Sequence, residues 1–456
     1  MLRMFALALL LVVALPHAAA ADSRATARSL LTRALADAPS IGNQVLRTTT
    51  LLQIVELLAR AGDVEGAMKW APKVRERDRP AAVNRIAIAQ ADAGDTEGAT
   101  RTLGSIPSGE RGPALAAIAI AQARKGDLTA GLQTAKGIED VMSRGVALRE
   151  IASLQIRAGA TASALETARF MQPLARSAMF QEIAAAQARA GDIKAAEETA
   201  TAALQEAPGA DVWGAIAEAR AQVGDLAAAL QYLARAADPQ ARARAVAAVA
   251  AAQAKVGDLA AATATVAALA SDRDRAGATE AVAVALAEAG NVAAGVPLAE
   301  NIAAPRVAAA TLRRIALVQL RGGDIAGALD TAARLRDPRE AALARGPIAV
   351  AQAKAGQAAA ALATATGLPQ LRDSLLPEVM TALAESEDYV GARQVAGQIG
   401  SPVDRDGALL RVEIARAQRG DAQGVLDFAA SRPSLDARVR ALVDAAAALL
   451  RSNPRP

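Results

Sequence analysis

Small and apolar residues recur along the chain at helical spacing, in a pattern that repeats every 31 to 33 residues. Each period has a central residue, which is Gly in all but one case and is most often followed by Asp. An Ile or Val lies eight positions before it, and a small residue lies five positions after it in eleven of twelve periods. Offsets of three and four mark one face of a helix, so each period predicts two amphipathic helices. The central residues are Gly62, Gly94, Gly126, Gly159, Gly191, Gly224, Gly257, Gly290, Gly323, Gly356, Glu387 and Gly420.

A pair such as Gly191-Asp192 has a physical reason to lie between two helices. Gly adopts the left-handed conformation that ends a helix without steric cost. The Asp side chain accepts a hydrogen bond from the free N–H groups that begin the next helix. The pattern therefore predicts helix–turn–helix units, with a first helix of about 13 residues, a second of about 12, and loops of roughly four to six between units.

This repeat resembles the tetratricopeptide repeat family over nearly the whole chain beyond its first segment. The shared features are the period, the turn Gly, a small residue seven positions before it, such as Ala87, and a small residue five after it, such as Ala99. The family's usual aromatic in the first helix is replaced by Gln, as at Gln90, so we expect a divergent version. Another α-α solenoid is the alternative. An ankyrin array fits less well, because the Thr-Pro-Leu-His start of its repeats is absent.

Composition agrees with helices that pack closely through small side chains. Hydrophobic residues make up 53% of the 456 residues, but aromatic residues only 2%. The apolar content is therefore Ala, Leu, Val and Ile, and Ala has the highest helix propensity. We predict an all-α fold, an α-α superhelical solenoid of about twelve repeats of roughly 33 residues.

The first segment has the layout of a secretory signal peptide. Arg3 precedes an apolar run from Phe5 to Leu15, and small residues follow at positions 18–21. This run is shorter than the about 20 residues that span a bilayer. We expect cleavage after residues 1–21, export to the periplasm or outside the cell, and no transmembrane span in the mature chain.

The remaining organisation follows from the repeat. We predict a capping helix at 22–40, a repeat array at 41–433, a second capping helix at 434–451 and a disordered tail at 452–456. Terminal caps are expected because each repeat of a solenoid buries only its neighbour's face. Pro297 and Pro347 fall inside predicted helices, where Pro should kink or shorten them.

The residues that most catalytic sites need are missing. The chain has no Cys, and its one His, His17, lies in the predicted signal peptide. Ser-His-Asp, Cys-His and histidine zinc sites are thereby excluded from the mature chain. No Gly-rich phosphate loop and no Asp-rich calcium loop is present, so we expect no enzyme activity, no cofactor and no metal. The net charge of +4 gives no support to nucleic-acid binding.

Three polar columns repeat with the period. The first column, four positions before the turn, is Gln, and we expect its amide to hydrogen-bond between stacked repeats. It comprises Gln90, Gln122, Gln155, Gln187, Gln253, Gln319 and Gln352. The second column, fifteen positions before the turn, is Arg, which we expect to bond to the end of the previous unit's helix. It comprises Arg47, Arg79, Arg111, Arg144, Arg176, Arg242, Arg275, Arg372 and Arg405. Two before the turn, a cation that complements the helix dipole occurs at Arg60, Arg124, Arg157, Arg189, Lys255, Arg321 and Lys354.

Positions nine and two before the turn share one side of the first helix, since seven residues make almost two turns. The nine-before position varies in type, which would suit either a binding groove or a solvated face. Our candidate partner-binding residues on this side are Arg124, Glu150, Arg157, Glu182, Arg189, Lys255, Arg314, Arg321 and Lys354. We expect an exported, non-enzymatic scaffold or adaptor that binds protein or peptide segments, including acidic ones. The alternative is an accessory or regulatory subunit of a cell-envelope enzyme complex.

Overall fold

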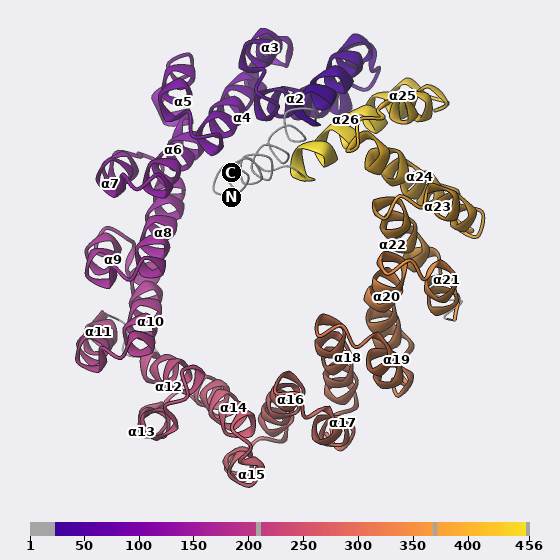
Figure 1. Cartoon of the computed structure of the whole chain (residues 1–456). Coiled ribbons are helices and arrows are strands. Elements are labelled where there is room, and N and C mark those ends of the chain that lie inside the picture. The colour runs from indigo at the N-terminus through magenta and orange to yellow at the C-terminus, as the bar shows by residue number, and fades with distance from the viewer. Residues whose placement is uncertain (1–22, 207–210, 368–371, 453–456) are drawn as a thin grey trace, which may run out of the picture. The chain divides into compact units, whose positions relative to one another are not determined.

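The structure, a computed structural model, describes residues 23–206, 211–367 and 372–452, and its regular elements there are all helices (Figure 1). The predicted all-α repeat fold is confirmed. The predicted signal peptide and the predicted tail beyond residue 452 lie outside the described residues.

Each repeat contributes a first and a second helix. The first helices are α2 (Gln44–Arg60), α4 (Arg79–Asp92), α6 (Gly112–Arg124), α8 (Val141–Arg157), α10 (Pro173–Ala190), α12 (Val212–Gln222), α14 (Pro239–Lys255), α16 (Asp272–Glu288), α18 (Pro305–Arg321), α20 (Pro338–Lys354), α22 (Arg372–Glu385) and α24 (Pro402–Ala417). The second helices are α3 (Val64–Trp70), α5 (Thr96–Leu103), α7 (Leu128–Lys136), α9 (Thr161–Ala168), α11 (Ile193–Glu206), α13 (Leu226–Arg235), α15 (Leu259–Ala267), α17 (Val292–Glu300), α19 (Ile325–Ala333), α21 (Ala358–Thr366), α23 (Tyr389–Ala396) and α25 (Gln423–Ala430).

Other helices lie before, between and after these pairs. A helix over residues 23–37 precedes the array, and α26 (Leu435–Ser452) follows it. Short 3₁₀ helices occur at η1 (Ala38–Ser40), η2 (Ala71–Lys73), η3 (Glu76–Asp78) and η4 (Ser108–Glu110).

The helix lengths differ from the sequence prediction. Seven of the twelve first helices have 17 or 18 residues, and most second helices have only seven to ten. Some first helices are longer because a proline, such as Pro239 or Pro305, begins the helix, where Pro is well tolerated. Second helices are shorter because they end before the buried aliphatic residue that stands twelve positions after the turn. Ile138, for example, is buried but follows the end of α7 at Lys136. Pro297 and Pro347 do not shorten α17 or α20.

The turns have the predicted geometry. The eleven turn glycines all have a positive φ, between 75° and 96°, and Glu387 takes the same conformation with φ 68°. At the first turn, the N–H of Asp63 donates to the carbonyl of Leu58, a Schellman closure, and its side chain accepts from Gly66 N–H. Asp421 is an exception, because it pairs with Arg416 and leaves Ala422 as the cap of α25. One residue thus ends the first helix and the next starts the second.

The Gln column joins the two helices of one repeat, which corrects the expectation of bonds between repeats. The Oε1 of Gln155 accepts from Thr167 Oγ1 at 2.8 Å, and both side chains are buried. The same bond, from a Thr twelve residues later, is made by Gln90, Gln122, Gln319 and Gln352. In these five repeats, the bond between Gln and Thr therefore links the first helix to the second.

Part of the Arg column joins successive repeats, as predicted, whereas Arg79, Arg242 and Arg405 make no such bond in the described residues. The Arg111 guanidinium donates to the carbonyl of Ile106, twelve residues after the preceding turn, at 2.7 and 2.9 Å. Arg144 donates likewise to Ile138 at 3.0 Å, and Arg275 to Leu269. The side chain of Arg372 lies outside the described part of the chain. These bonds satisfy carbonyls at the end of a second helix, which lack partners within that helix.

The chain forms two compact units, one of residues 1–147 with 383–456 and the other of residues 148–382. Within the second unit, neighbouring first helices from α10 to α20 pack side by side, and each second helix packs on its own first helix (Figure 1). Within the first unit, α2, α4 and α6 form a similar row. First helices are therefore the continuous layer, and side chains on their open side lie next to one another.

Candidate protein-binding face

The nine candidate binding residues lie on the open side of the first helices. Arg124 belongs to the first unit, and the other eight belong to the second. Eight of the nine are exposed, and Glu150 is half-buried. The prediction that this side is open to solvent is therefore confirmed, whereas its role in binding stays a prediction.

Ion pairs occupy part of this face. Arg157 Nη2 lies 3.4 Å from Glu150 Oε1 on the same helix, and Lys255 Nζ lies 2.8 Å from Glu288 Oε2 on the next first helix. Arg189 Nη1 donates to Gln222 Oε1 at 3.5 Å. Arg321 is exposed at the end of α18. The column of cations is thus partly neutralised within the protein.

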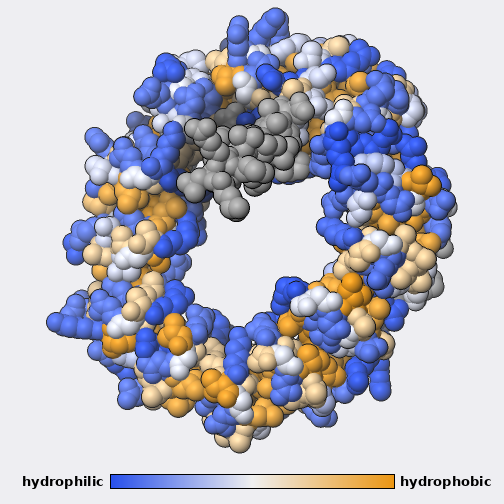
Figure 2. All heavy atoms as spheres, viewed as in Figure 1, coloured by the Kyte–Doolittle hydropathy of each residue, from blue (hydrophilic) through white to orange (hydrophobic). Residues whose placement is uncertain are grey.

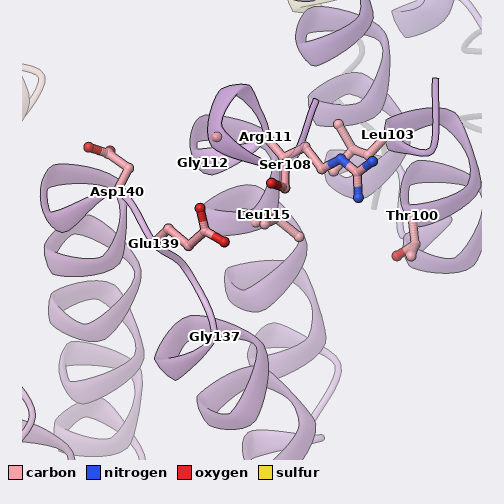
Figure 3. Close-up of a pocket in the computed structure, with 10 residues that line it drawn as sticks. Thr100, Leu103, Ser108, Arg111, Gly112, Leu115, Gly137, Glu139 and Asp140 are labelled. Atoms are coloured by element: carbon pink, nitrogen blue, oxygen red, sulfur yellow. The ribbon is translucent and has the colours of Figure 1, made fainter. Parts of the chain in front are cut away.

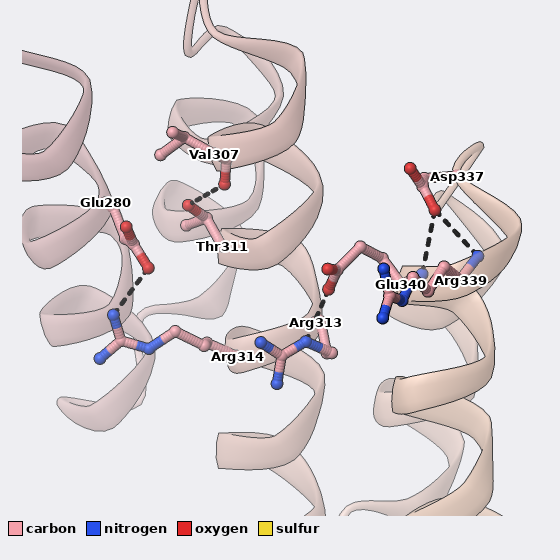
Figure 4. A network of polar contacts seen from close by, with 8 residues as sticks. All are labelled: Glu280, Val307, Thr311, Arg313, Arg314, Asp337, Arg339 and Glu340. Carbon is pink, nitrogen blue, oxygen red and sulfur yellow. Dashed lines mark hydrogen bonds and ion pairs between the residues drawn. The ribbon is translucent and has the colours of Figure 1, made fainter. Parts of the chain in front are cut away.

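Arg314 has a structural contact that its sequence position did not reveal. Its Nη1 donates to Glu280 on α16 at 2.7 Å, while the adjacent Arg313 donates through Nε to Glu340 on α20, also at 2.7 Å (Figure 4). Two consecutive arginines thereby reach in opposite directions to the two neighbouring first helices. The sequence shows the two adjacent arginines, but it does not show their partners, which are 34 residues from Arg314 and 27 residues from Arg313.

Exposed apolar residues are scattered rather than gathered. On the side that Figure 2 shows, hydrophobic and hydrophilic residues are interspersed along the second unit. Larger exposed apolar side chains occur singly or in pairs, for example Val256 and Leu259 beside one turn. Scattered apolar residues are normal on protein surfaces, so charge is the more informative property of the binding face.

A small polar pocket lies in the first unit between η4, α6 and the start of α8 (Figure 3). It has a volume of about 160 Å³, and Arg111, Glu139 and Asp140 contribute to its lining. Two of these three charged groups are engaged in the fold, because Arg111 bonds to Ile106 and Asp140 accepts from Ser143 N–H at 2.7 Å. The hydrogen bonds from Ser143 lower the pKa of Asp140. The volume is below the roughly 300 Å³ at which small-molecule sites begin.

An aromatic cluster that the sequence analysis did not single out ties α11, α12 and α13 together. The planes of Trp213 and Tyr232 are stacked, with centroids 6.1 Å apart, and the Arg235 guanidinium lies 3.4 Å from the Trp213 centroid. Glu197 accepts from Tyr232 at 3.1 Å and from Arg235 at 2.9 Å. Burial, followed by the Glu197 contact, raises the pKa of Tyr232. Its polar groups are paired with one another, so this cluster stabilises the repeat.

Two carboxyl groups of α12 are held in a less solvated setting. Burial raises the pKa of Glu218 and of Asp211, while nearby Arg244 opposes the shift. Asp211 also caps α12 by accepting from Gly214 N–H. Raised carboxyl pKa values are a mark of active sites, but Glu218 pairs with Arg244 at 3.8 Å and Asp211 caps a helix, so both groups have structural roles. Elsewhere in the described residues, Asp, Glu, His and Cys form no group of three or more that could bind a metal ion.

Comparisons with known proteins found similarity to solved structures but not to any protein family. No protein-family model and no curated protein sequence matches the chain. Among solved structures, the chain is similar to Ton1535 from Thermococcus onnurineus NA1, with 14% identity and a TM-score of 0.22 over 80% of this chain and 99% of that one. It is also similar to Naa15/Naa10 bound to HypK-THB, with 17% identity and a TM-score of 0.28 over 91% and 81% of the two chains. A circular tandem repeat protein with novel repeat topology has 15% identity and a TM-score of 0.11 over 94% and 88%.

The class of protein is accordingly defined by the helices themselves. The chain is an α-helical tandem-repeat protein, with twelve helix–turn–helix repeats of about 33 residues. None of the described helices has both the length and the hydrophobicity that crossing a membrane requires.

Proposed function

We propose that this protein is an exported, non-enzymatic scaffold of tetratricopeptide-like repeats that binds segments of other proteins on the open side of its first helices. The observation that carries the proposal is the row of exposed cations on that side of the second unit, including Arg157, Arg189, Lys255 and Arg321. Continuous side chains on stacked helices are the usual binding surface of solenoids.

The ion pairs on this face leave it open to a partner. Arg157 and Glu150 keep 60% and 34% of their side-chain surface exposed, and Lys255 and Glu288 keep 51% and 41%. Exposed pairs of this kind contribute only about 0–1 kcal/mol each. A partner carboxylate can therefore replace Glu150 or Glu288 at small cost, which favours a segment with acidic residues.

The test neutralises two cations that lack a carboxylate partner among the described contacts. Arg189→Gln with Arg321→Gln should reduce crosslinked recovery of native partners by roughly two- to thirtyfold, since each of the two surface charges contributes about 0.2–1 kcal/mol. Arg273→Gln with Arg336→Gln is the control, because both side chains are exposed and stand at other positions of the repeat, one at the start of α16 and the other between α19 and α20.

Both double variants lose the same charge, so a general electrostatic effect would appear in both. Recovery that falls equally in the two variants, or in neither, contradicts the proposed face. The binding difference should also shrink at high salt, because exposed charges are screened within about 10 Å at 0.1 M ionic strength.

Export is the second part of the proposal and is tested separately. Small residues at positions 18–21 place the mature start at Ala21 or Asp22. Intact-mass measurement on protein recovered from the native envelope should match one of these starts. A full-length mass contradicts export by a cleaved signal and leaves the binding face to be tested inside the cell. An enzyme recovered as the main partner would favour the role of accessory subunit in an envelope complex.

A further inference from the structure

The last helix of the array, α26, is buried like an internal first helix. Its buried side chains span an arc of about 240° at 100° per residue, whereas a helix packed on one side only buries a much narrower stripe. They are Val439, Ala441, Leu442, Val443, Ala445, Ala446, Ala447 and Leu449. The helix packs on α24 and α25, which precede it, and also on α2. Something from the other end of the array therefore covers the side that a terminal cap would leave open.

The sequence of α26 also has the register of a first helix. Ser434 caps it by accepting from Ala437 N–H, as Ser401 caps α24 by accepting from Asp404 N–H. Arg438 and Arg451 stand fifteen and two positions before residue 453, which lies 33 residues after Gly420, one period further along the chain. By this register α26 is the first helix of a thirteenth repeat.

Residues 23–41 have the register of a second helix. In an internal repeat, buried residues at five, nine and twelve positions after the turn face the first helix, as Ala328, Ala332 and Leu335 do. Ala34, Ala38 and Ile41 have the same spacing and are exposed by 0%, 0% and 1%. The buried side chains of the 23–37 helix, such as Leu30 and Leu31, lie in one core cluster with Val439, Leu442 and Leu449 of α26.

The bond that joins successive repeats is present at this point too. Arg47 Nη1, at the start of α2, donates to the carbonyl of Ile41 at 2.9 Å. Arg111 makes the same contact with Ile106, and Arg144 with Ile138. Residues 23–41 are thus followed by α2 in the way that an internal second helix is followed by the next first helix.

We propose that α26 and residues 23–41 are the two halves of one split repeat, brought together from opposite ends of the chain. Each half removes from solvent an apolar face of the other, so the first unit needs no polar terminal cap. No peptide loop joins the halves in the described residues, so apolar packing holds them together. The two predicted capping helices therefore cover each other within the first unit.

The test uses the absence of Cys from the chain. Val443→Cys and Ala445→Cys are single reporters on opposite sides of α26, because two residues correspond to 200°. Both sites are buried and should react slowly with a maleimide. Leu31→Asp on the 23–37 helix should then accelerate labelling at one or both sites at least tenfold. Ile183→Asp, an equally buried change in the second unit, is the control and should not.

Three outcomes overturn the proposal. Labelling at both sites that is unchanged by Leu31→Asp means that the N-terminal helix does not cover α26. Acceleration of equal size by Ile183→Asp means that the reporters sense general instability. Labelling that speeds up when the unmutated reporter proteins are diluted means that the halves pair between two copies of the chain.

A circularly permuted chain keeps the proposal testable if Leu31→Asp does not fold. Residue 452 is joined to residue 23 by an eight-residue Gly-Ser linker, which reaches at most about 29 Å, and new ends are opened in the loop between α17 and α18. Monomeric size and a helical circular dichroism signal equal to the parent's are expected, because close ends tolerate permutation. Loss of the fold, while an unlinked chain that is cut in the same loop keeps it, overturns the proposal.

Discussion

Removing one hydroxyl from the Gln column isolates the contribution of a buried hydrogen bond between the two helices of a repeat. The Thr167 side chain is fully buried, and its Oγ1 donates to Gln155 Oε1 at 2.8 Å. Thr167→Val preserves the branched shape but deletes the donor. Gln155 is 4% exposed, so water has little access to the amide oxygen that is left without its donor.

The expected loss of stability is about 1–3 kcal/mol, the cost of leaving a buried polar group unsatisfied. The next repeat provides a matched control. Thr199 stands at the same position and is 3% exposed, but the amide oxygen of its Gln187 has no hydrogen-bond partner in the structure. Thr199→Val should therefore cost less than Thr167→Val, because it removes the donor from no bonded amide oxygen.

The assay is native-state hydrogen exchange of α8 and α9, supported by urea unfolding followed by circular dichroism. Exchange is the sharper measurement, because contacts in a repeat array are between neighbours and one repeat can open alone. The double variant Gln155→Leu with Thr167→Val should recover part of the loss, since no unpaired amide oxygen remains. Equal losses for Thr167→Val and Thr199→Val would refute this reasoning, because the bond would then explain nothing.

The remaining predictions concern the turns and one acidic side chain. Gly191→Val should destabilise its repeat by about 1–3 kcal/mol, because Gly191 has a φ of 87° and β-branched residues are strained there; an unchanged melting profile would contradict this. Glu387→Gly should gain up to about 1 kcal/mol in urea unfolding by relieving the same strain, less what its pairing with Arg419 contributes. Because burial raises the pKa of Glu218, its contribution favours the folded state below its ordinary value and falls as pH rises through the folded pKa. Glu218→Gln should therefore reduce the loss of stability above about pH 4.5, followed as the melting temperature at several pH values. The gain in stability should be less than about 1 kcal/mol, because the side chain is partly exposed. An unchanged pH profile of the melting temperature would count against the raised pKa.

The repeats and their turns could be predicted from the sequence because they depend on local chemistry. A helix end needs a left-handed residue and a cap within a few positions, and both are visible as Gly191-Asp192 and its equivalents. Exposure of the two-before position followed in the same way from helical periodicity, as at Arg189. The exposure of the candidate face could therefore be predicted, although the sequence could not show its ion pairs.

The Gln contacts were within reach of the sequence but were assigned to the wrong neighbour. In all seven repeats with Gln four before the turn, the residue eight after it is Thr, and in the other five it is not. Repeats without this Gln carry other pairs, such as Arg220 with Asp225 in the repeat that contains Tyr232. Comparing repeats with one another would have identified Gln155 and Thr167 as partners within one unit.

Only the tertiary structure decided which distant segments meet. Arg313 and Arg314 are adjacent in sequence, yet they bind helices on opposite sides, and no local periodicity encodes that choice. The 23–37 helix and α26 were each predicted to be a cap, because each is a single helix at one end of the repeat array. Burial of α26 on both sides depends on contacts with segments from the other end of the chain within the first unit, which no single repeat determines.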